Sequence, residues 1–290
     1  MSSPTLLGDL AAIGVSPLHL GIAIAVLAVT LALYGRAPKP CGTARLTYFE
    51  GHGRAEEVRL MLAACGVPWL DEVHGDEAGA RFVTTQAQMR KMMAAGVLAM
   101  DQLPLLEIDG LHLVQHAAIL RYLARRHNMY GSTLAEAAKI DILSDSMGDW
   151  APITALMQAR DASAAHAKYL ARFTRALTSN ADGDFLAGRS LSFADVQLFH
   201  ALEQLANAGV VDLPGKWPAL DAYRRRIRAL GPIAAYVESG RQTPFPGAGG
   251  RDAFFQTVRA TLPWVFGKAE LPPLLSARWH FSKLGTSLSR

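Results

Sequence analysis

Hydrophobic and polar positions change their spacing along this chain, and each change predicts a different element. Arg45 to Phe49 and Trp69 to Val73 are short segments whose aromatic and β-branched residues are typical of β-strands. Between them, Ala55 to Cys65 has the apolar spacing of a helix, with glutamates in its first turn and Gly66 as its C-terminal stop. Strand, helix and strand in this order predict a small α/β unit with two parallel strands.

A hairpin that leads into a helix is predicted between Gln102 and Tyr122. Leu103 to Ile108 alternates, Asp109-Gly110 is a strong two-residue turn signal, and Leu111 to Val114 returns as the second strand. A helix then begins near His116, and its first amides lie unpaired at the positive end of the helix dipole. This geometry suits an anionic ligand. An ordinary hairpin that feeds a helix has the same pattern, so the spacing alone leaves both interpretations open.

From Thr133 onward the pattern is helical. Pro, Gly and Asp separate four segments with helical apolar spacing, which are Leu134 to Gln158, His166 to Leu177, Phe193 to Asn207 and Leu220 to Leu230. Ser192 to Asp195 forms a capping box that opens the third of these helices. The arginine-rich stretch Arg224 to Arg228 is predicted to be a solvated helix face. The second half is therefore expected to be an all-helical domain.

A long apolar segment, Leu10 to Tyr34, precedes the α/β unit. A helix that spans a bilayer needs about 20 such residues, so the segment predicts a membrane helix. A cleaved signal or a helix that docks on a partner remains an alternative, although Asp9 is the only charged residue before Arg36. Arg36 and Lys39 follow the apolar run, which places the folded part on the cytoplasmic-like side.

Composition indicates the redox state of the compartment and shows where the net positive charge lies in the chain. The chain has 290 residues, of which 50% are hydrophobic, so it can bury a large core. Its two cysteines, Cys41 and Cys65, form no disulfide framework, which fits a reducing compartment. Residues Phe245 to Arg290 carry six basic and two acidic side chains, a net of +4, which equals the net charge of the whole chain. Aromatics accompany these charges, and beside an apolar helix this favours a membrane surface or a membrane-protein partner over nucleic acid.

Two motifs carry a resemblance to a known family. LTYFEGHGRAEEVRLMLAACGVPW (Leu46 to Trp69) resembles the first strand and helix of the Alpha and Sigma classes of cytosolic glutathione transferases. Gln-x-Pro, Asp-Gly and Gln followed by an Ala-Ile helix resemble the glutathione-binding half of the same family, and the similarity covers roughly Arg45 to Ser239.

The resemblance implies a thioredoxin-like α/β domain followed by an all-α domain, with a cis peptide bond before Pro104. The expected organisation is an apolar helix and linker at residues 1–42, a thioredoxin-like glutathione-binding domain at 43–128, a helical domain at 129–244 and a basic, aromatic extension at 245–290.

The resemblance also implies the site residues. Tyr48 lies where the family keeps its catalytic tyrosine, and Arg54 matches the arginine that the Alpha class keeps beside the sulfur. The glutathione-binding residues carried over are Gln102, Leu103, Pro104, Gln115, His116 and Asp149, and Asp149 is expected to act across a dimer interface. His116 replaces the family's Ser or Thr, which binds the γ-glutamyl carboxylate.

Two methionines also depart from the family pattern. Met93 stands about where a basic residue contacts the glycyl carboxylate, although Arg90 and Lys91 are close to it in sequence. Met100 stands near the aromatic residue that Alpha-class dimers insert into the partner subunit. Dimerisation is therefore less firmly expected than for the family at large.

Two function classes follow from the resemblance. The first is a membrane-anchored glutathione transferase that uses glutathione and no metal, in which Tyr48 stabilises the thiolate for attack on a lipophilic electrophile or for reduction of a lipid peroxide. The second is a non-catalytic, transferase-like accessory subunit of a membrane complex, which His116, Met93 and Met100 favour. In either case the partners are membrane lipid, a homodimer or membrane-complex subunits, and the globular domain faces the cytosol or the matrix or stroma of an organelle.

Overall fold

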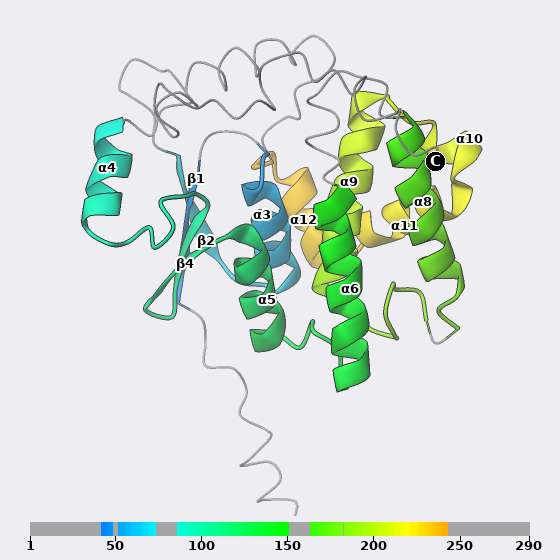
Figure 1. The fold of residues 1–290 in the computed structure, drawn as a ribbon, viewed down its shortest axis with the longest axis horizontal. Coiled ribbons are helices and arrows are strands. Elements are labelled where there is room, and N and C mark those ends of the chain that lie inside the picture. Colours follow the sequence, from blue (N-terminus) through cyan, green and yellow to red (C-terminus); the bar gives the residue numbers. More distant parts are fainter. Residues whose placement is uncertain (1–41, 49–51, 74–85, 151–162, 182, 243–290) are drawn as a thin grey trace, which may run out of the picture. The chain divides into compact units, whose positions relative to one another are not determined.

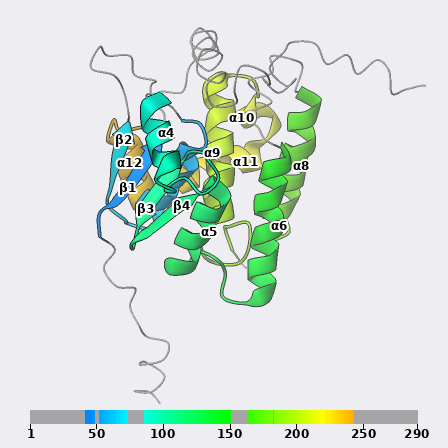
Figure 2. The same cartoon turned by 60° about the vertical axis from the view of Figure 1, so that its left-hand side comes forward.

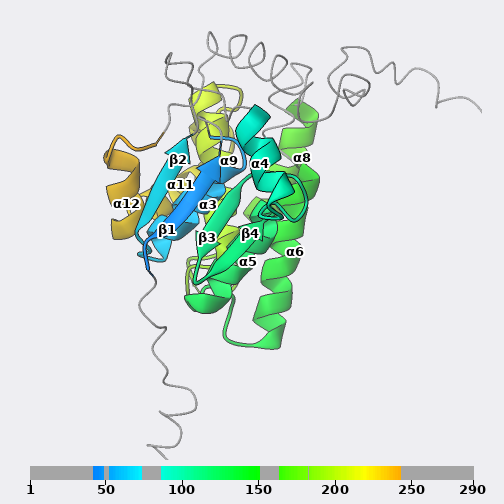
Figure 3. The ribbon, with the colours of Figure 1, turned by 90° about the vertical axis from the view of Figure 1, so that its left-hand side faces the viewer.

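The computed structural model describes residues 42–48, 52–73, 86–150, 163–181 and 183–242. It divides into two compact units between Cys41 and Gly42, and all described residues belong to the second. This unit contains a four-stranded sheet with the order β2-β1-β3-β4 (Figure 3). Its strands are β1 (Ala44–Tyr48), β2 (Trp69–Val73), β3 (Leu105–Ile108) and β4 (Leu111–Val114). The β1 and β2 strands are parallel as predicted, and β3 runs antiparallel to both β1 and β4.

Two helices cover one face of the sheet, α3 (Ala55–Ala64) and α5 (His116–Arg126). Figure 1 shows both helices on the same side of the sheet, with α4 (Gln86–Ala94) on the other. Val58, Leu62 and Leu123 are fully buried in the layer between the sheet and the helical half. Helix α4 is an element that the sequence analysis did not predict.

The hairpin and the helix after it form at the predicted residues. Asp109 and Gly110 have φ angles of 54° and 78°, the positive pair that a tight turn between twisted strands needs. Helix α5 begins at His116 as predicted. The Leu103–Pro104 peptide bond is cis, which confirms that expectation.

The second half is helical throughout its described residues. Its helices are α6 (Leu134–Trp150), α8 (Ser163–Thr178), α9 (Phe193–Ala208), α10 (Leu213–Lys216), α11 (Pro218–Arg228) and α12 (Gly231–Glu238). Helix α9 is central, because it packs against α3, α6 and α11 and is buried along most of its length (Figure 2). The short α10 and α12 helices were not predicted, and residues 151–158 of the first predicted helix lie outside the described residues.

The predicted capping box at the start of α9 is present. Asp195 Oδ2 accepts hydrogen bonds from the backbone amide of Ser192 at 2.8 Å and from its hydroxyl at 2.6 Å. The hydroxyl of Tyr223 on α11 donates to Asp195 Oδ1 at 2.8 Å, so the cap also joins two helices. Burial raises the pKa of Asp195, and these hydrogen bonds oppose the rise.

The interpretation of α11 as a solvated face is right only in part, since Arg225 is 66% exposed and Arg228 is 44% exposed. The arginines of Arg224 to Arg228 were expected to form a solvated face, but Arg224 donates to Glu203 on α9 at 2.7 Å and to Asp221 at 2.9 Å. Arg228 also pairs with Glu203. A nearly buried Glu203 needs positive partners, and α11 supplies them.

The predicted membrane helix, Leu10 to Tyr34, and the extension at 245–290 lie outside the described residues. Among the helices that the structure does describe, none is long and apolar enough to cross a bilayer. The boundaries at 128/129 and 244/245 stay predictions.

Candidate functional site

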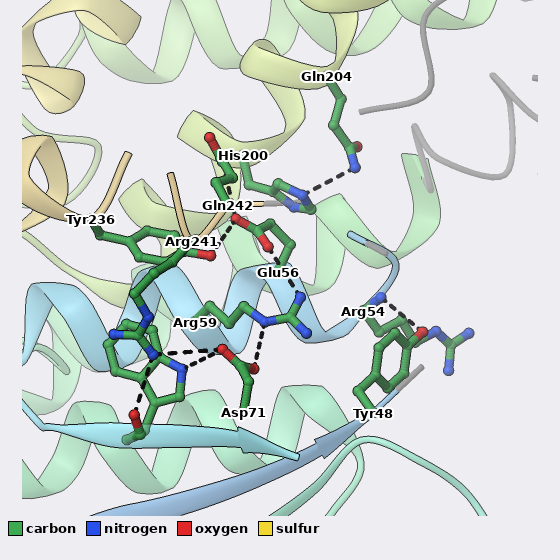
Figure 4. Close-up of polar contacts among 11 residues, drawn as sticks. Tyr48, Arg54, Glu56, Arg59, Asp71, His200, Gln204, Tyr236, Arg241 and Gln242 are labelled. Carbon is green, nitrogen blue, oxygen red and sulfur yellow. Dashed lines mark hydrogen bonds and ion pairs between the residues drawn. The ribbon is translucent and has the colours of Figure 1, made fainter. Parts of the chain in front are cut away.

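Tyr48 lies at the last residue of β1 and faces the start of α3 (Figure 4). The backbone amide of Arg54 donates to Tyr48 Oη at 3.2 Å. Gly53, with a φ of +40°, passes directly beside the ring, and a Cβ placed there would stand 2.8 Å from Tyr48 Cε1. The strand end, the glycine and the helix start therefore fix the position of the phenol together.

The Tyr48 hydroxyl is a neutral phenol at physiological pH. Burial raises the pKa of Tyr48, while the Arg54 amide and the guanidinium charges of Arg54 and Arg59 oppose the rise without cancelling it. A phenol oxygen that accepts an N–H bond keeps its own hydrogen as a donor. The arrangement suits donation to an anion better than removal of a proton from a ligand.

Arg54 connects the two candidate halves of the site. It is the residue that precedes α3, and its side chain is exposed. Its charge opposes the rise that burial causes in the pKa of Tyr48, and it adds to burial in lowering the pKa of His116 at the start of α5. One guanidinium therefore acts on both predicted parts of the site.

Two of the residues that are predicted to bind glutathione contact each other. Gln115 Nε2 donates to Gln102 Oε1 at 3.1 Å, and both side chains are exposed. Gln115 has a φ of 68°, a strained conformation for a residue with a side chain. Pro104 is buried, and half-buried Leu103 packs against a small apolar cluster around Leu98 and Leu105.

His116 contacts a buried polar cluster that the sequence analysis did not identify. His116 Nε2 lies 3.8 Å from Glu57 Oε2, and His200 Nδ1 lies 3.5 Å from Glu57 Oε1. Gln197 Nε2 donates to Glu57 Oε2 at 3.2 Å. Glu57 was recognised only as an acidic residue of the first helical turn. No local pattern could have revealed the cluster, because its members come from α3, α5 and α9.

Asp149 and the two methionines lie apart from these contacts. Asp149 is exposed on α6, and among the described residues it makes no hydrogen bond or ion pair with Tyr48, Arg54 or His116. Met93 and Met100 are exposed as well. A role of Asp149 across a dimer interface stays a prediction.

The described residues contain no group of three or more His, Cys, Asp or Glu side chains that could hold a metal ion. Cys65 is half-buried, with its thiol 3.7 Å from the sulfur of Met129. This contact is typical of a cysteine that packs rather than reacts.

Comparisons with known proteins identify the family to which this sequence belongs. Residues 154–240 match the family model for the glutathione S-transferase C-terminal domain. Glutathione S-transferase A4 of Mus musculus is 34% identical over 232 residues, which are 75% of this chain and 97% of that protein. The chain belongs to the glutathione S-transferase family. The alpha-4 glutathione S-transferase of Rattus norvegicus is 33% identical over 213 residues, or 70% of this chain and 91% of that protein.

A solved glutathione S-transferase has the same fold. The crystal structure of a nematode glutathione S-transferase from C. elegans superposes with a TM-score of 0.58 at 28% identity, and the match covers 70% of this chain and 99% of that one. The predicted combination of a thioredoxin-like domain and a helical domain is thereby confirmed as the glutathione transferase fold. Glutathione is the substrate that this family of enzymes uses.

Proposed function

We propose that this glutathione S-transferase activates the thiol of glutathione with Tyr48 and transfers it to lipophilic electrophiles. The observation that supports the proposal most strongly is the fixed, neutral phenol at the end of β1, held by the Arg54 amide and by Gly53. An ordinary cysteine thiol has a pKa of about 8.5, so at neutral pH most glutathione is unreactive. A hydrogen bond from Tyr48 and the charge of Arg54 favour the thiolate and lower that pKa.

In conjugation, the thiolate sulfur forms a bond to an electrophilic carbon, and the leaving group departs with the electron pair of the broken bond. In peroxide reduction, two glutathione molecules are oxidised to one disulfide while the lipid hydroperoxide becomes an alcohol and water. Tyr48 serves both reactions in the same way, because both begin with attack by the thiolate.

We propose that the remaining predicted residues hold the tripeptide. The Leu103 backbone pairs with the cysteinyl part, and the bonded side chains of Gln102 and Gln115 line the γ-glutamyl part beside the start of α5. Pro104 shapes the loop. Asp149 contributes from a second copy of the chain, so this residue acts only in a dimer.

The test is direct. Full-length protein in mild detergent is titrated with glutathione in a calorimeter and is then assayed for conjugation of 1-chloro-2,4-dinitrobenzene. We expect saturable binding heat and turnover above the uncatalysed rate. If the protein showed neither binding nor turnover, the second candidate function would remain. That candidate is a non-catalytic accessory subunit, which the departures at His116, Met93 and Met100 favour.

We further propose that Leu10 to Tyr34 anchors the enzyme in a membrane, which would bring the site close to lipophilic substrates. We expect the full-length protein to remain in the membrane pellet after alkaline carbonate washing, whereas a variant that lacks residues 1–42 is recovered in the supernatant. Release of the full-length protein by carbonate would contradict the anchor.

A further inference from the structure

The polar cluster around Glu57 lies where three helices converge, and it reaches the proposed glutathione site. Glu57 comes from the first turn of α3, His116 from the first residue of α5, and His200 from the middle of α9. Only 16% of the Glu57 side chain and 2% of the His200 side chain are exposed, while His116 is 25% exposed. His116 is therefore the member of the cluster that a ligand can touch.

The cluster stabilises Glu57 as a carboxylate. Burial opposes its charge, but the hydrogen bond and charge of His200, the charge of His116 and the amide of Gln197 together lower the pKa of Glu57. Gln204 Nε2 lies 3.0 Å from His200 Nε2.

The charge of His116 depends on the groups around its ring. Burial lowers its pKa, and Glu57 opposes that effect, whereas the charges of Arg54, His200 and Arg121 add to it. Its Nδ1 is buried and has no hydrogen-bond partner among the described residues. His116 is thus neutral near pH 7 in the free protein, and a second negative group near its ring would shift the balance toward the imidazolium.

A ligand carboxylate at the start of α5 brings that second negative group. It would lie beside His116 and near the negative charge of Glu57, and a neutral imidazole between the two would leave their repulsion uncompensated. One proton on His116 offsets this repulsion, because the positive ring lies beside the incoming carboxylate while Nε2 donates toward Glu57.

We propose that His116 binds a carboxylate of glutathione as an imidazolium ion, taking up a proton as the ligand binds, with Glu57 as its built-in counter-ion. The inference rests on the proposed function and adds a proton linkage to the same site. The pKa of His116 is lower in the free protein and higher in the complex, so binding takes up a proton between the two values. Affinity then falls as the pH rises from the lower to the higher value, by about tenfold per pH unit at its steepest.

The experiment uses S-methylglutathione, which has no thiol proton, so any proton exchanged belongs to the protein, to the ligand's carboxylates or to its α-amine. Calorimetric titrations at the same pH in two buffers with different ionisation enthalpies give the number of protons taken up. We expect uptake that approaches one proton per molecule bound at its maximum between pH 6 and 8, with a dissociation constant that rises with pH.

Three variants test whether His116 is the residue that takes up the proton. His116→Ser restores a hydroxyl at this position and should bind S-methylglutathione without proton uptake and with little pH dependence. Glu57→Gln should reduce the proton uptake. Because this variant lacks the repulsion between Glu57 and the ligand carboxylate, it should also bind S-methylglutathione more tightly than the wild type at pH 8. Weaker binding at every pH would indicate that Glu57 has a structural role only. His127→Gln, at the opposite end of α5, removes another partly buried histidine and should leave the uptake unchanged.

The outcomes separate this inference from the proposed function. Binding without proton uptake between pH 6 and 8 would overturn the inference and leave the glutathione site intact. Uptake that persists in His116→Ser would also overturn it, because another group would then carry the proton. An absence of S-methylglutathione binding at any pH would instead refute the proposed function, and the inference would fall with it.

Discussion

Replacing Arg59 by methionine is expected to lower the free energy of unfolding by about 3–5 kcal/mol, because it leaves buried carboxylates without their cation. Arg59 is 3% exposed, and its guanidinium lies 2.8 Å from Asp71 Oδ1 on β2 and 3.2 Å from Glu56 Oε2. Burial opposes its charge, but the two carboxylates outweigh burial and raise the pKa of Arg59. Methionine fills a similar volume and supplies no charge.

The loss of the Arg59 charge is also expected to weaken the contacts that the end of the helical domain makes with α3 and β2. Glu56 is fully buried, and its Oε1 accepts hydrogen bonds from the Tyr236 hydroxyl and from Gln242 Nε2, both at 3.0 Å (Figure 4). Asp71 accepts from the indole of Trp69 at 3.0 Å and pairs with Arg241 at 3.6 Å. The two carboxylates that Arg59 neutralises thus connect α3 and β2 to α12 and the residues after it.

Urea unfolding followed by circular dichroism and tryptophan fluorescence measures this loss. The matched control is Arg45→Met, since Arg45 is half-exposed and pairs with Glu72 and Glu107 at the surface. An exposed pair contributes about 0–1 kcal/mol, so the control should unfold close to the wild-type midpoint. Equal losses in the two variants would show that the buried network does not stabilise the fold in the way its geometry indicates.

Local patterns predicted the elements that local interactions determine. The Asp109-Gly110 turn, the start of α5 at His116 and the Ser192–Asp195 capping box all depend on residues within a few positions of each other. Helix α4 was missed although Thr85 and Gln88 have the spacing of a capping box, because its sequence, QAQMRKMMA, offers only a short apolar stripe.

The polar networks could not be predicted from local patterns. Gln242 contacts Glu56 across 186 positions, and His200 contacts Glu57 across 143 positions. Charged residues on a first helical turn are usually solvated, so the sequence alone favours a dipole role for both glutamates. The tertiary fold buries them, and burial is what makes their partners necessary. Resemblance placed Tyr48 and Arg54 together, but the role of Gly53 beside the phenol emerges only from the three-dimensional contact.

Tyr48→Phe is expected to lower kcat/KM for conjugation by about 10–100-fold at pH 6.5–7. A hydrogen bond to a charged group contributes about 1.5–3 kcal/mol, and this bond stabilises the thiolate that reacts. The loss should shrink as the pH rises above the pKa of the unassisted thiol, where the thiolate forms without help. Because burial raises the pKa of Tyr48 above its ordinary value of about 10, the wild type should show no loss from tyrosinate formation up to pH 9.

Two further variants separate the hydroxyl from the ring position. Tyr122→Phe removes a phenol that donates to Asp109 at 2.6 Å, away from Tyr48, and should keep the wild-type pH profile. Gly53→Ala keeps the Tyr48 hydroxyl but places a methyl group against its ring, so it should lose activity near neutral pH although no donor has been deleted. If Tyr48→Phe retained the wild-type rate at pH 6.5, thiolate stabilisation would have to come from Arg54 or from the helix α3 amides. The raised pKa of the phenol would then reflect burial without a catalytic use.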